Sequence, residues 1–303
     1  MDLRQLAALT AVAEAGSFSA AARRLHTVQS NVSTHVARLE AELGATLVDR
    51  STGTLTDEGD VVASRARRIQ HELESLRADV DSMLHEVAGP VRLGCIGTVG
   101  RWLVPRLLEG IADRHPKVRI IVVDATTTSL VPQLVAETLD LAVVNLPVGG
   151  GDLATEPLFD EDRIILAPLD HPLAAEATVS LEQLAEHPLL LEPQGTAFRD
   201  ELDDAVRNVD VVLDVQAEID GIRLLTSLAY DGFGPAMVPA TAAPAWMEAA
   251  CRRVTVDGLT PRSVGLATPR RGRLSAPARA VRDVIRDLVT TTEQPGVHPT
   301  LAG

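Results

Sequence analysis

The stretch from Ala20 to Gly44 places the tightest constraint on how this chain can fold. Its sequence, AAARRLHTVQSNVSTHVARLEAELG, predicts two short helices that meet at a tight turn. We expect Thr27 to cap the second helix, because a hydroxyl side chain there can accept a backbone N–H of the first turn. Spacings of four, three and four residues predict one apolar stripe along that helix. The stripe consists of Val32, Val36, Leu39 and Leu43.

The two-helix stretch has two interpretations. An ordinary helical hairpin explains the apolar stripe, and for the stripe alone it is the better interpretation. A helix-turn-helix also needs a second helix whose outward face can enter a major groove, with its first residues at the base edges. The face opposite the stripe fits this need, because its side chains are small and polar.

The wider match favours the helix-turn-helix. Small residues before Leu25, then TVQSNVS, then LEAELG before Leu47 and Arg50 resemble the DNA-binding segment of LysR-type transcriptional regulators. The resemblance continues in LTDEG and, more loosely, over nearly the whole chain. It implies a winged helix-turn-helix over residues 1–58 that binds double-stranded DNA. The residues expected to face bases are Gln29, Ser30, Asn31, Ser33 and Thr34, and those expected at phosphates are Arg23, Arg24, Arg38 and Arg50.

The segment LVDRSTGTLTDEG predicts a short β-hairpin, the wing of this domain. Only four residues, STGT, lie between Arg50 and Leu55, where the family usually has a longer loop with basic residues. Whether this shortened wing contacts DNA is therefore left open.

Residues 57 to about 87 predict one long helix with a heptad repeat, and we assign 59–90 as a linker and dimerisation helix. We expect Gly89-Pro90 to end the helix and to form a hinge. The repeat runs through Val62, Ala66, Ile69, Leu73, Leu76, Val80, Met83 and Val87. A second copy of the chain is the expected partner of this stripe, and the alternative is that the stripe packs on the following domain.

Residues 91–292 alternate between strand and helix patterns, which predicts an α/β domain with a parallel sheet. The resemblance implies a two-lobed, periplasmic-binding-protein-like (type 2) effector domain. Its first lobe covers about 91–165 and 264–292, and its second about 166–263. We expect the tail, 293–303, to be disordered.

Threonines at strand-to-helix junctions mark a candidate effector cleft. Ligands of open α/β sheets bind outside the carboxyl ends of the strands, where helix N-termini favour an anion or a carbonyl. The alternative is that these hydroxyls cap their own helices. The candidate effector residues are Thr98, Val99, Thr126, Thr127, Thr128, Gly195, Thr196, Phe198 and Asp220.

Catalytic motifs find little support in the sequence. The glycines of GCIGTVG have the spacing G-x-x-G-x-x-G rather than that of a dinucleotide-binding turn. The eight histidines have no metal-ligand spacing, and Cys95 and Cys251 form no disulfide framework. We therefore expect no enzyme activity, no cofactor and no metal. A redox role for Cys95 is left open, with a core position favoured.

Composition bounds the remaining possibilities. The net charge of −14, with five arginines against eight acidic residues in the first 60, predicts weak non-specific binding to DNA. No apolar run is long enough to span a membrane and the N-terminus lacks a leader, so we expect a cytoplasmic protein without a membrane partner.

The sequence thus predicts a ligand-responsive transcriptional regulator that binds an operator as a homodimer. The resemblance implies a homotetramer and a contact with RNA polymerase. The effector is a small molecule that the sequence does not identify. The alternative is a cytoplasmic small-molecule receptor, or an enzyme, whose N-terminal helices serve only oligomerisation.

Overall fold

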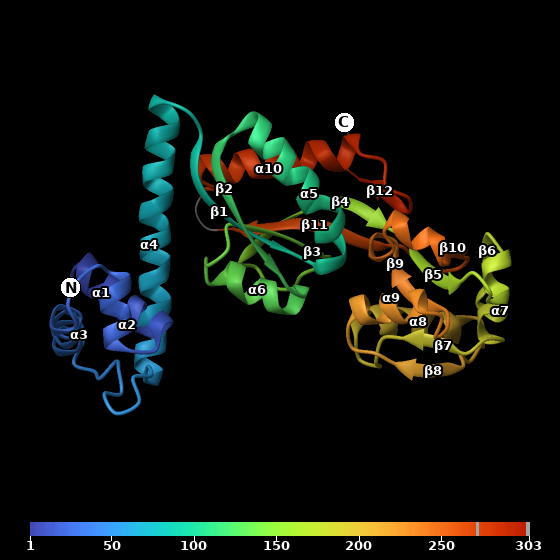
Figure 1. The fold of residues 1–303 in the computed structure, drawn as a ribbon, viewed down its shortest axis with the longest axis horizontal. Helices are drawn as coiled ribbons and strands as arrows, with labels where there is room; N and C mark the ends of the chain where they lie inside the picture. Colours follow the sequence, from blue (N-terminus) through green and yellow to red (C-terminus); the bar gives the residue numbers. More distant parts are fainter. Residues whose placement is uncertain (271–272, 301–303) are drawn as a thin grey trace.

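The computed structural model describes residues 1–270 and 273–300. Figure 1 shows a small helical domain at one end, the long helix α4 beside it, and an α/β domain of two lobes. The bounds of the first helices are α1 (Leu3–Ala15), α2 (Phe18–Arg24), α3 (Gln29–Leu43) and α4 (Asp57–Leu84). No helix in the described ranges is long and apolar enough to cross a membrane.

Local signals define the ends of the first two helices. The Asp2 side chain accepts the backbone N–H of Gln5, whose own side chain accepts that of Asp2, so α1 begins with a capping box. Gly16 ends α1 in the left-handed region at φ 68°. The Ser17 side chain accepts the Ala20 N–H and thereby caps α2.

Two expectations for α3 were wrong. Val28, rather than Thr27, precedes the helix, and it makes no side-chain cap. The Thr27 hydroxyl instead accepts a hydrogen bond from the Asn31 side chain, at 3.0 Å. Leu43 is 44% exposed, because the core of this domain includes Val32, Val36 and Leu39 but does not reach the last turn of α3.

The wing is a minimal hairpin. Val48 and Leu55 form one isolated antiparallel bridge. Backbone bonds from Asp49 N–H to the Thr54 carbonyl (2.9 Å) and from Thr56 N–H to the Leu47 carbonyl (3.1 Å) complete it. The loop is too short for a longer ladder, so the expected strands are reduced to this bridge.

The long helix ends earlier than expected. α4 stops at Leu84, so Val87 lies outside the helix and is not part of its apolar stripe. Gly89 and Pro90 do not form a hinge, because they belong to strand β1 (Ala88–Cys95) and pair with β2. The pairing of β1 with β3 begins only at Leu93, so the missing N–H of Pro90 lies where β1 has one neighbour.

The first lobe contains a mixed sheet rather than a fully parallel one. The strand order is β12-β4-β11-β3-β1-β2. β1, β2 and β3 are parallel, whereas β11 is antiparallel to both β3 and β4. The remaining elements are β2 (Lys117–Asp124), β3 (Leu141–Asn145), β4 (Leu153–Glu161), β11 (Arg262–Pro269), α5 (Gly97–Arg114), α6 (Thr127–Val135) and α10 (Ala276–Thr291).

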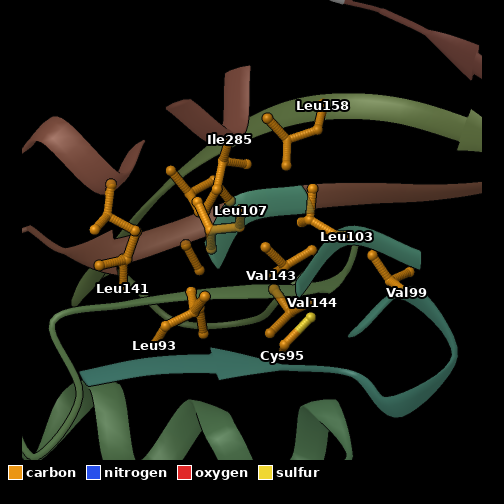
Figure 2. Packing of buried hydrophobic residues seen from close by; sticks show 14 of the residues in the cluster. Leu93, Cys95, Val99, Leu103, Leu107, Leu141, Val143, Val144, Leu158 and Ile285 are labelled. Atoms are coloured by element: carbon orange, nitrogen blue, oxygen red, sulfur yellow. The ribbon is translucent and has the colours of Figure 1, made fainter. Parts of the chain in front are cut away.

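Helices cover both faces of this sheet. α5 and α10 lie over one face and α6 over the other. Figure 2 shows the core between the sheet and α5 and α10, where Leu93 and Val143 from the strands face Leu103, Leu107 and Ile285 from the helices. This core fixes the start of α5 next to the carboxyl end of β1.

The second lobe has its own sheet, of order β6-β10-β5-β9-β7-β8, with a hydrophobic core on each face. The chain enters this lobe at Asp162, between β4 and β5, and leaves it before β11. The elements are β5 (Arg163–Pro168), β6 (Thr178–Val179), α7 (Leu181–Ala185), β7 (Leu189–Leu191), α8 (Ala197–Asn208), β8 (Val215–Glu218), α9 (Ile222–Tyr230), β9 (Ala236–Pro239) and β10 (Cys251–Val256), with 3-10 turns at Pro172–Ala175, Ala240–Ala242 and Ala245–Ala249.

The C-terminal tail forms a strand, which corrects the expectation of disorder over its described part. β12 (Val297–Pro299) pairs antiparallel with β4, because β4 would otherwise be an open edge of the first sheet. The Thr300 N–H extends the ladder to the Leu158 carbonyl, at 3.0 Å. Residues 301–303 lie outside the described ranges.

Candidate functional site

The first turns of α3 form an exposed polar face. Gln29, Ser30, Asn31 and Thr34 are exposed, and Ser33 is half-buried. The Thr34 hydroxyl donates to the Ser30 carbonyl at 2.8 Å. The five candidate base-facing residues therefore lie within the first two turns of one helix, and four of them are exposed.

Arg50 is held against this face by three neighbours. It donates to the Ser33 hydroxyl at 2.9 Å and to the Glu40 carboxylate at 3.0 Å. Its guanidinium also lies 5.1 Å from the centre of the Phe18 ring. Glu40 in turn accepts the N–H groups of Leu47 and Val48, so it joins α3 to the wing. The sequence predicted that Arg50 contacts a DNA phosphate, but it did not predict the contacts with Ser33, Glu40 and Phe18 that hold the side chain.

The other candidate phosphate-binding arginines are exposed. Arg24 pairs with Glu14 of α1 at 2.5 Å. Arg23 and Arg38 form no ion pair among the described residues. Cations with free donors are the groups that contact DNA phosphates.

An apolar stripe on α4 faces solvent. Its exposed fractions are 40% for Ile69, 58% for Leu76, 48% for Val80 and 86% for Met83. Leu73 is half-buried between them. Val62 instead packs on the core of the N-terminal domain, so its expected part in the stripe is wrong. The stripe is therefore shorter than the sequence indicated and begins near Ile69.

A different face of α4 packs on the first lobe. His71 contacts the buried Asp140 carboxylate at 3.1 Å, and Glu74 pairs with Arg92 at 3.1 Å. Asp79 accepts the N–H of Ala276 at the start of α10, at 2.6 Å. The alternative, in which the apolar stripe packs on the following domain, is therefore wrong. The face of α4 that packs on the first lobe is mainly polar.

The Asp140 carboxylate determines the charge state of this junction. It accepts the Arg92 N–H at 2.6 Å and is 5% exposed. Its hydrogen bond to His71 raises the pKa of that imidazole, although burial and Arg92 oppose the effect. The contact between His71 and Asp140 therefore joins α4 to the effector domain.

The first-lobe side of the cleft contains Thr98 at the start of α5. Its hydroxyl accepts a hydrogen bond from the Arg262 guanidinium at 2.9 Å. The Val99 side chain is fully buried in the core, so only its backbone N–H can face a ligand. Arg262, which starts β11, is a cleft cation that the sequence reasoning missed.

The threonine hydroxyls at the start of α6 bond to other side chains or to β3 rather than to the backbone N–H groups of the first helical turn. The Thr127 hydroxyl accepts the N–H of Asn145 at the end of β3, at 3.0 Å. The Thr126 and Thr128 hydroxyls lie 2.9 Å apart and are exposed. Thr126 makes no side-chain cap on α6, so the capping alternative fails here.

On the second-lobe side, the capping alternative holds. Thr196 accepts the Arg199 N–H at 3.3 Å and caps α8. The Gly195 N–H donates to Asp200 at 3.1 Å, and Phe198 packs on the core of this lobe. Asp220 is exposed in the turn before α9.

Buried charges gather where the chain crosses between the lobes. Glu161 has no exposed surface, and its carboxylate accepts the Arg262 Nε at 2.7 Å and the Thr241 N–H at 2.5 Å. Burial, and then the nearby Arg262, lowers the pKa of Arg163 to about 10. Burial raises the pKa of Glu192, and Arg262 opposes this. The charged run Glu161-Asp162-Arg163 between apolar segments was the available sequence signal.

Neither cysteine has the surroundings of a reactive thiol. Cys95 is 1% exposed in the core of the first lobe, and burial raises its pKa to about 12. Cys251 is 2% exposed in the second lobe, where burial also raises its pKa. Within the described ranges, no three His, Cys, Asp or Glu side chains are grouped as metal ligands.

Two family models match the chain. One, described as a bacterial regulatory helix-turn-helix protein of the lysR family, covers residues 3–60. The other, the LysR substrate binding domain, covers residues 85–290. Together they span both parts of the fold described above.

Related proteins match over most of their length. A probable hydrogen peroxide-inducible genes activator of Mycobacterium leprae is 33% identical over 297 residues, 94% of each chain. The transcriptional dual regulator OxyR of Escherichia coli is 28% identical, over 80% of this chain and 81% of its own.

Solved structures share the fold. A full-length OxyR variant from Pseudomonas aeruginosa has a TM-score of 0.74 at 25% identity, over 100% of this chain and 99% of its own. Full-length CbnR in complex with its target DNA has a TM-score of 0.70 at 24% identity, over 95% and 99%. With both domains matched, the chain belongs to the LysR family of ligand-responsive, DNA-binding transcriptional regulators.

Proposed function

We propose that this regulator reads a pseudo-palindromic operator as a dimer whose two α3 helices enter successive major grooves. The observation that carries the proposal is the exposed polar face of α3, followed along the chain by the exposed apolar stripe of α4. Small polar side chains at the start of a recognition helix suit base contacts, and a helix pair sets the half-site spacing.

Within this proposal, the five polar candidates of α3 face bases, while Arg23, Arg38 and Arg50 lie at phosphates. The five are Gln29, Ser30, Asn31, Ser33 and Thr34. Arg24 must exchange Glu14 for a phosphate. Because the whole chain carries a net charge of −14, non-specific affinity depends on these few arginines and on their duplication in the dimer. The salt dependence of operator binding should therefore be modest.

The oligomer follows from α4. Ile69, Leu73, Leu76, Val80 and Met83 form the dimer seam. A tetramer assembled from two such dimers, and a contact with RNA polymerase, complete the proposed regulatory complex. A reader of chromosomal DNA works in the cytoplasm, and we assign the chain no catalytic role.

The effector is proposed to bind between the lobes, where Thr98, Thr126 to Thr128 and Asp220 lie. Arg262 joins this set because it links Thr98 to the buried Glu161. Because Thr98 only accepts from Arg262, its own O–H can still donate to an acceptor group of a ligand. The ligand switches the regulator only if it binds one lobe arrangement more tightly than another.

Peroxide sensing, which the names of the relatives raise, is a second candidate. Oxidation by peroxide needs a thiolate that solvent can reach. Cys95 and Cys251 are both buried, have raised pKa values and belong to different lobes. We therefore favour a bound small molecule over thiol oxidation. A Cys95→Ser, Cys251→Ser double variant should bind its operator identically before and after peroxide treatment, as should the wild type.

The deciding experiment is footprinting of the purified protein on the DNA upstream of its own gene, and then on genomic fragments, across salt concentrations. A two-fold symmetric footprint with half-sites about 10 bp apart would support the proposal. Failure of both searches would favour a receptor whose N-terminal helices serve assembly only.

A further inference from the structure

The C-terminal segment that follows α10 contacts both lobes. α10 belongs to the first lobe and ends at Thr291. Residues 295 and 296 then reach the second lobe, and β12 returns to the sheet of the first lobe. Figure 1 shows β12 beside β4, next to the point where the chain enters the second lobe. Residues 294–300 therefore lie across the junction between the lobes.

Asp162, the one residue between β4 and β5, is bonded to this segment and to the second lobe. Its N–H donates to the Gly296 carbonyl at 2.9 Å, and its carboxylate lies 2.9 Å from Nε2 of His298. Its carbonyl accepts the N–H of Ala240, which follows β9 in the second lobe, at 3.0 Å. The crossing residue is thus fixed from two directions.

Arg253 of β10 joins the segment directly to the second lobe. Its half-buried guanidinium donates to the Pro295 carbonyl at 2.8 Å and to the Ala243 carbonyl at 2.7 Å. Ala243 belongs to the second lobe, so one side chain bonds its own lobe and the C-terminal segment together. Hydrogen bonds from a charged donor are stronger than those between neutral groups.

Gly296 allows the closest approach of the segment to the second lobe. Its φ of 72° lies in the left-handed region, which favours glycine. A Cβ atom at this position would lie 2.7 Å from the Cβ of Ala240 and 3.2 Å from a carboxylate oxygen of Asp162. Any other residue would therefore force the segment and the Ala240 turn apart.

The end of the segment is anchored in the first lobe. β12 pairs with β4 from Val297 to Pro299, and the Thr300 N–H continues this pairing. Val297 also packs on the core of the first lobe. The segment is therefore attached to the first lobe at both ends, through α10 and through β12, and to the second lobe in its middle.

We propose that residues 294–300 form a strap that fastens the second lobe to the first and restricts how the lobes can move. A hinge works by changes of φ and ψ at a few residues between two rigid bodies. Asp162 is such a position, and the strap bonds to its N–H and its carboxylate. A movement of the lobes about this crossing must break the contacts of Arg253 or of Gly296 with the strap's neighbours.

The strap sets the starting point for any effector that acts on the lobes. A ligand shifts an arrangement only by its differential affinity, so the bonds of the strap add to the free energy that the ligand must supply. The inference concerns the lobes alone. It does not depend on the residues assigned to DNA or to the effector, and its failure would leave those assignments unchanged.

The test is a spin-label distance measurement between the lobes of the full-length protein. Asp283→Cys on α10 and Val212→Cys in the second lobe place one label on each lobe, at exposed positions. Cys95 and Cys251 are buried and stay unlabelled. Labelled chains are mixed with an excess of unlabelled chains, so that each oligomer carries one labelled pair.

Two variants release the strap from opposite sides of one contact. Arg253→Met removes the donors but keeps the length of the side chain, and Gly296→Ala adds the Cβ that meets Ala240. Each should widen the distance distribution about twofold, because hinge motion is no longer restricted. His298→Ala removes only an exposed contact with Asp162 and should widen it less.

Matched controls separate the strap from general effects. Arg252→Met changes the neighbouring, exposed arginine of β10 and should leave the distribution as in the wild type. Gly232→Ala introduces a similar left-handed strain in the second lobe, at φ 83°, where a Cβ would meet no atom of the described residues within 4 Å. It too should leave the distribution unchanged.

The proposal is overturned if Arg253→Met and Gly296→Ala both keep the wild-type distribution. It is also overturned if Arg252→Met and Gly232→Ala widen the distribution as much. Circular dichroism checks that each variant keeps its helix content. If one of the two release variants does not fold, the other and His298→Ala decide the outcome.

Discussion

The DNA-binding part and the effector domain expose their candidate site residues in different ways. The five base-facing candidates come from consecutive turns of α3, and four of them are exposed. The cleft candidates come from both lobes, and several have partners already: Thr98 with Arg262, Thr127 with Asn145, and Thr196 with its own helix. A single helix exposes neighbouring side chains through its own geometry. A cleft hydroxyl is free to bind a ligand only if no residue from a distant segment already forms a hydrogen bond with it.

The largest effect that tests this comparison is expected on α4, which also presents its residues from one helix. Leu76→Asp places a charge in the middle of the apolar stripe, where a partner helix would bury it. Two such changes per dimer remove about 1.5 to 3 kcal/mol each, so the dimer dissociation constant should rise more than about 100-fold.

Sedimentation velocity at several protein concentrations measures this change. Arg77→Asp adds the same side chain at an exposed position beside the stripe and should retain the dimer. If Leu76→Asp remains as dimeric as Arg77→Asp, the stripe is not the seam.

The next effect concerns the exposed face of α3. Thr34→Glu adds a negative charge where the proposed helix meets DNA, and the affinity for the footprinted operator should fall about 100-fold. Because Thr34 is exposed, the thermal midpoint should not change. Gel-shift titration measures the affinity, and Ala41→Glu, at an exposed position later in the same helix, is the matched control.

Equal losses in Thr34→Glu and Ala41→Glu would indicate a general charge effect. In that case the groove assignment of the α3 N-terminus would be wrong.

A smaller effect is expected in the cleft, where a substitution should lower stability and leave operator affinity unchanged. Thr127→Val leaves the Asn145 N–H without its acceptor, so the free energy of unfolding should fall by about 1 kcal/mol while operator affinity is retained. Urea unfolding measures this. Thr128→Val is the control, because its hydroxyl is exposed and bonds only to Thr126.

The double variant Thr98→Val, Thr127→Val should also blunt the response to an effector, in a promoter-reporter assay, without weakening DNA binding. A normal response in that variant would place the effector elsewhere.

The smallest effect is the pH dependence of the α4 junction. The hydrogen bond with Asp140 raises the folded-state pKa of His71, so protonation of His71 stabilises the folded protein. This contribution is complete below pH about 6.5, the value of an unfolded histidine, and is lost as pH rises through the raised folded-state pKa. His71 faces Asp140, Glu74 and Arg92 in the folded state.

His71→Gln should therefore lower the free energy of unfolding by about 1 kcal/mol at low pH and by less as the pH rises. Urea unfolding between pH 6 and pH 9, about the range that histidine titration covers, measures the difference. Thr128→Val removes no titratable group and lies outside this junction, so any change it makes in stability should be equal at every pH.

Local patterns predicted the helical part well. The spacing of Val32, Val36 and Leu39 identified the buried face of α3, and the heptad repeat identified α4. The wrong predictions there concern the ends of helices. The positions of Thr27, Leu43 and Val87 depend on how the neighbouring segment packs, which the local pattern does not show. The repeat does not reveal that Val62 packs on the N-terminal core.

In the effector domain, alternation of strand and helix indicated an α/β fold but not its pairing. Pairing alone decided that β11 runs antiparallel and that Val297–Pro299 is a strand on β4. The buried Glu161 and Arg262 are 101 residues apart in the chain, so no local pattern connects them.

The sequence by itself determined the helices of the DNA-binding part, the long linker helix and the α/β class, because side chains a few residues apart share one face of a helix or strand. The assignment of the first helices as a helix-turn-helix came from the resemblance to the LysR family. The tertiary structure decided which hydroxyls of the cleft remain free and which face of α4 meets the first lobe. Those properties depend on partners that the chain brings together only after its local elements have packed.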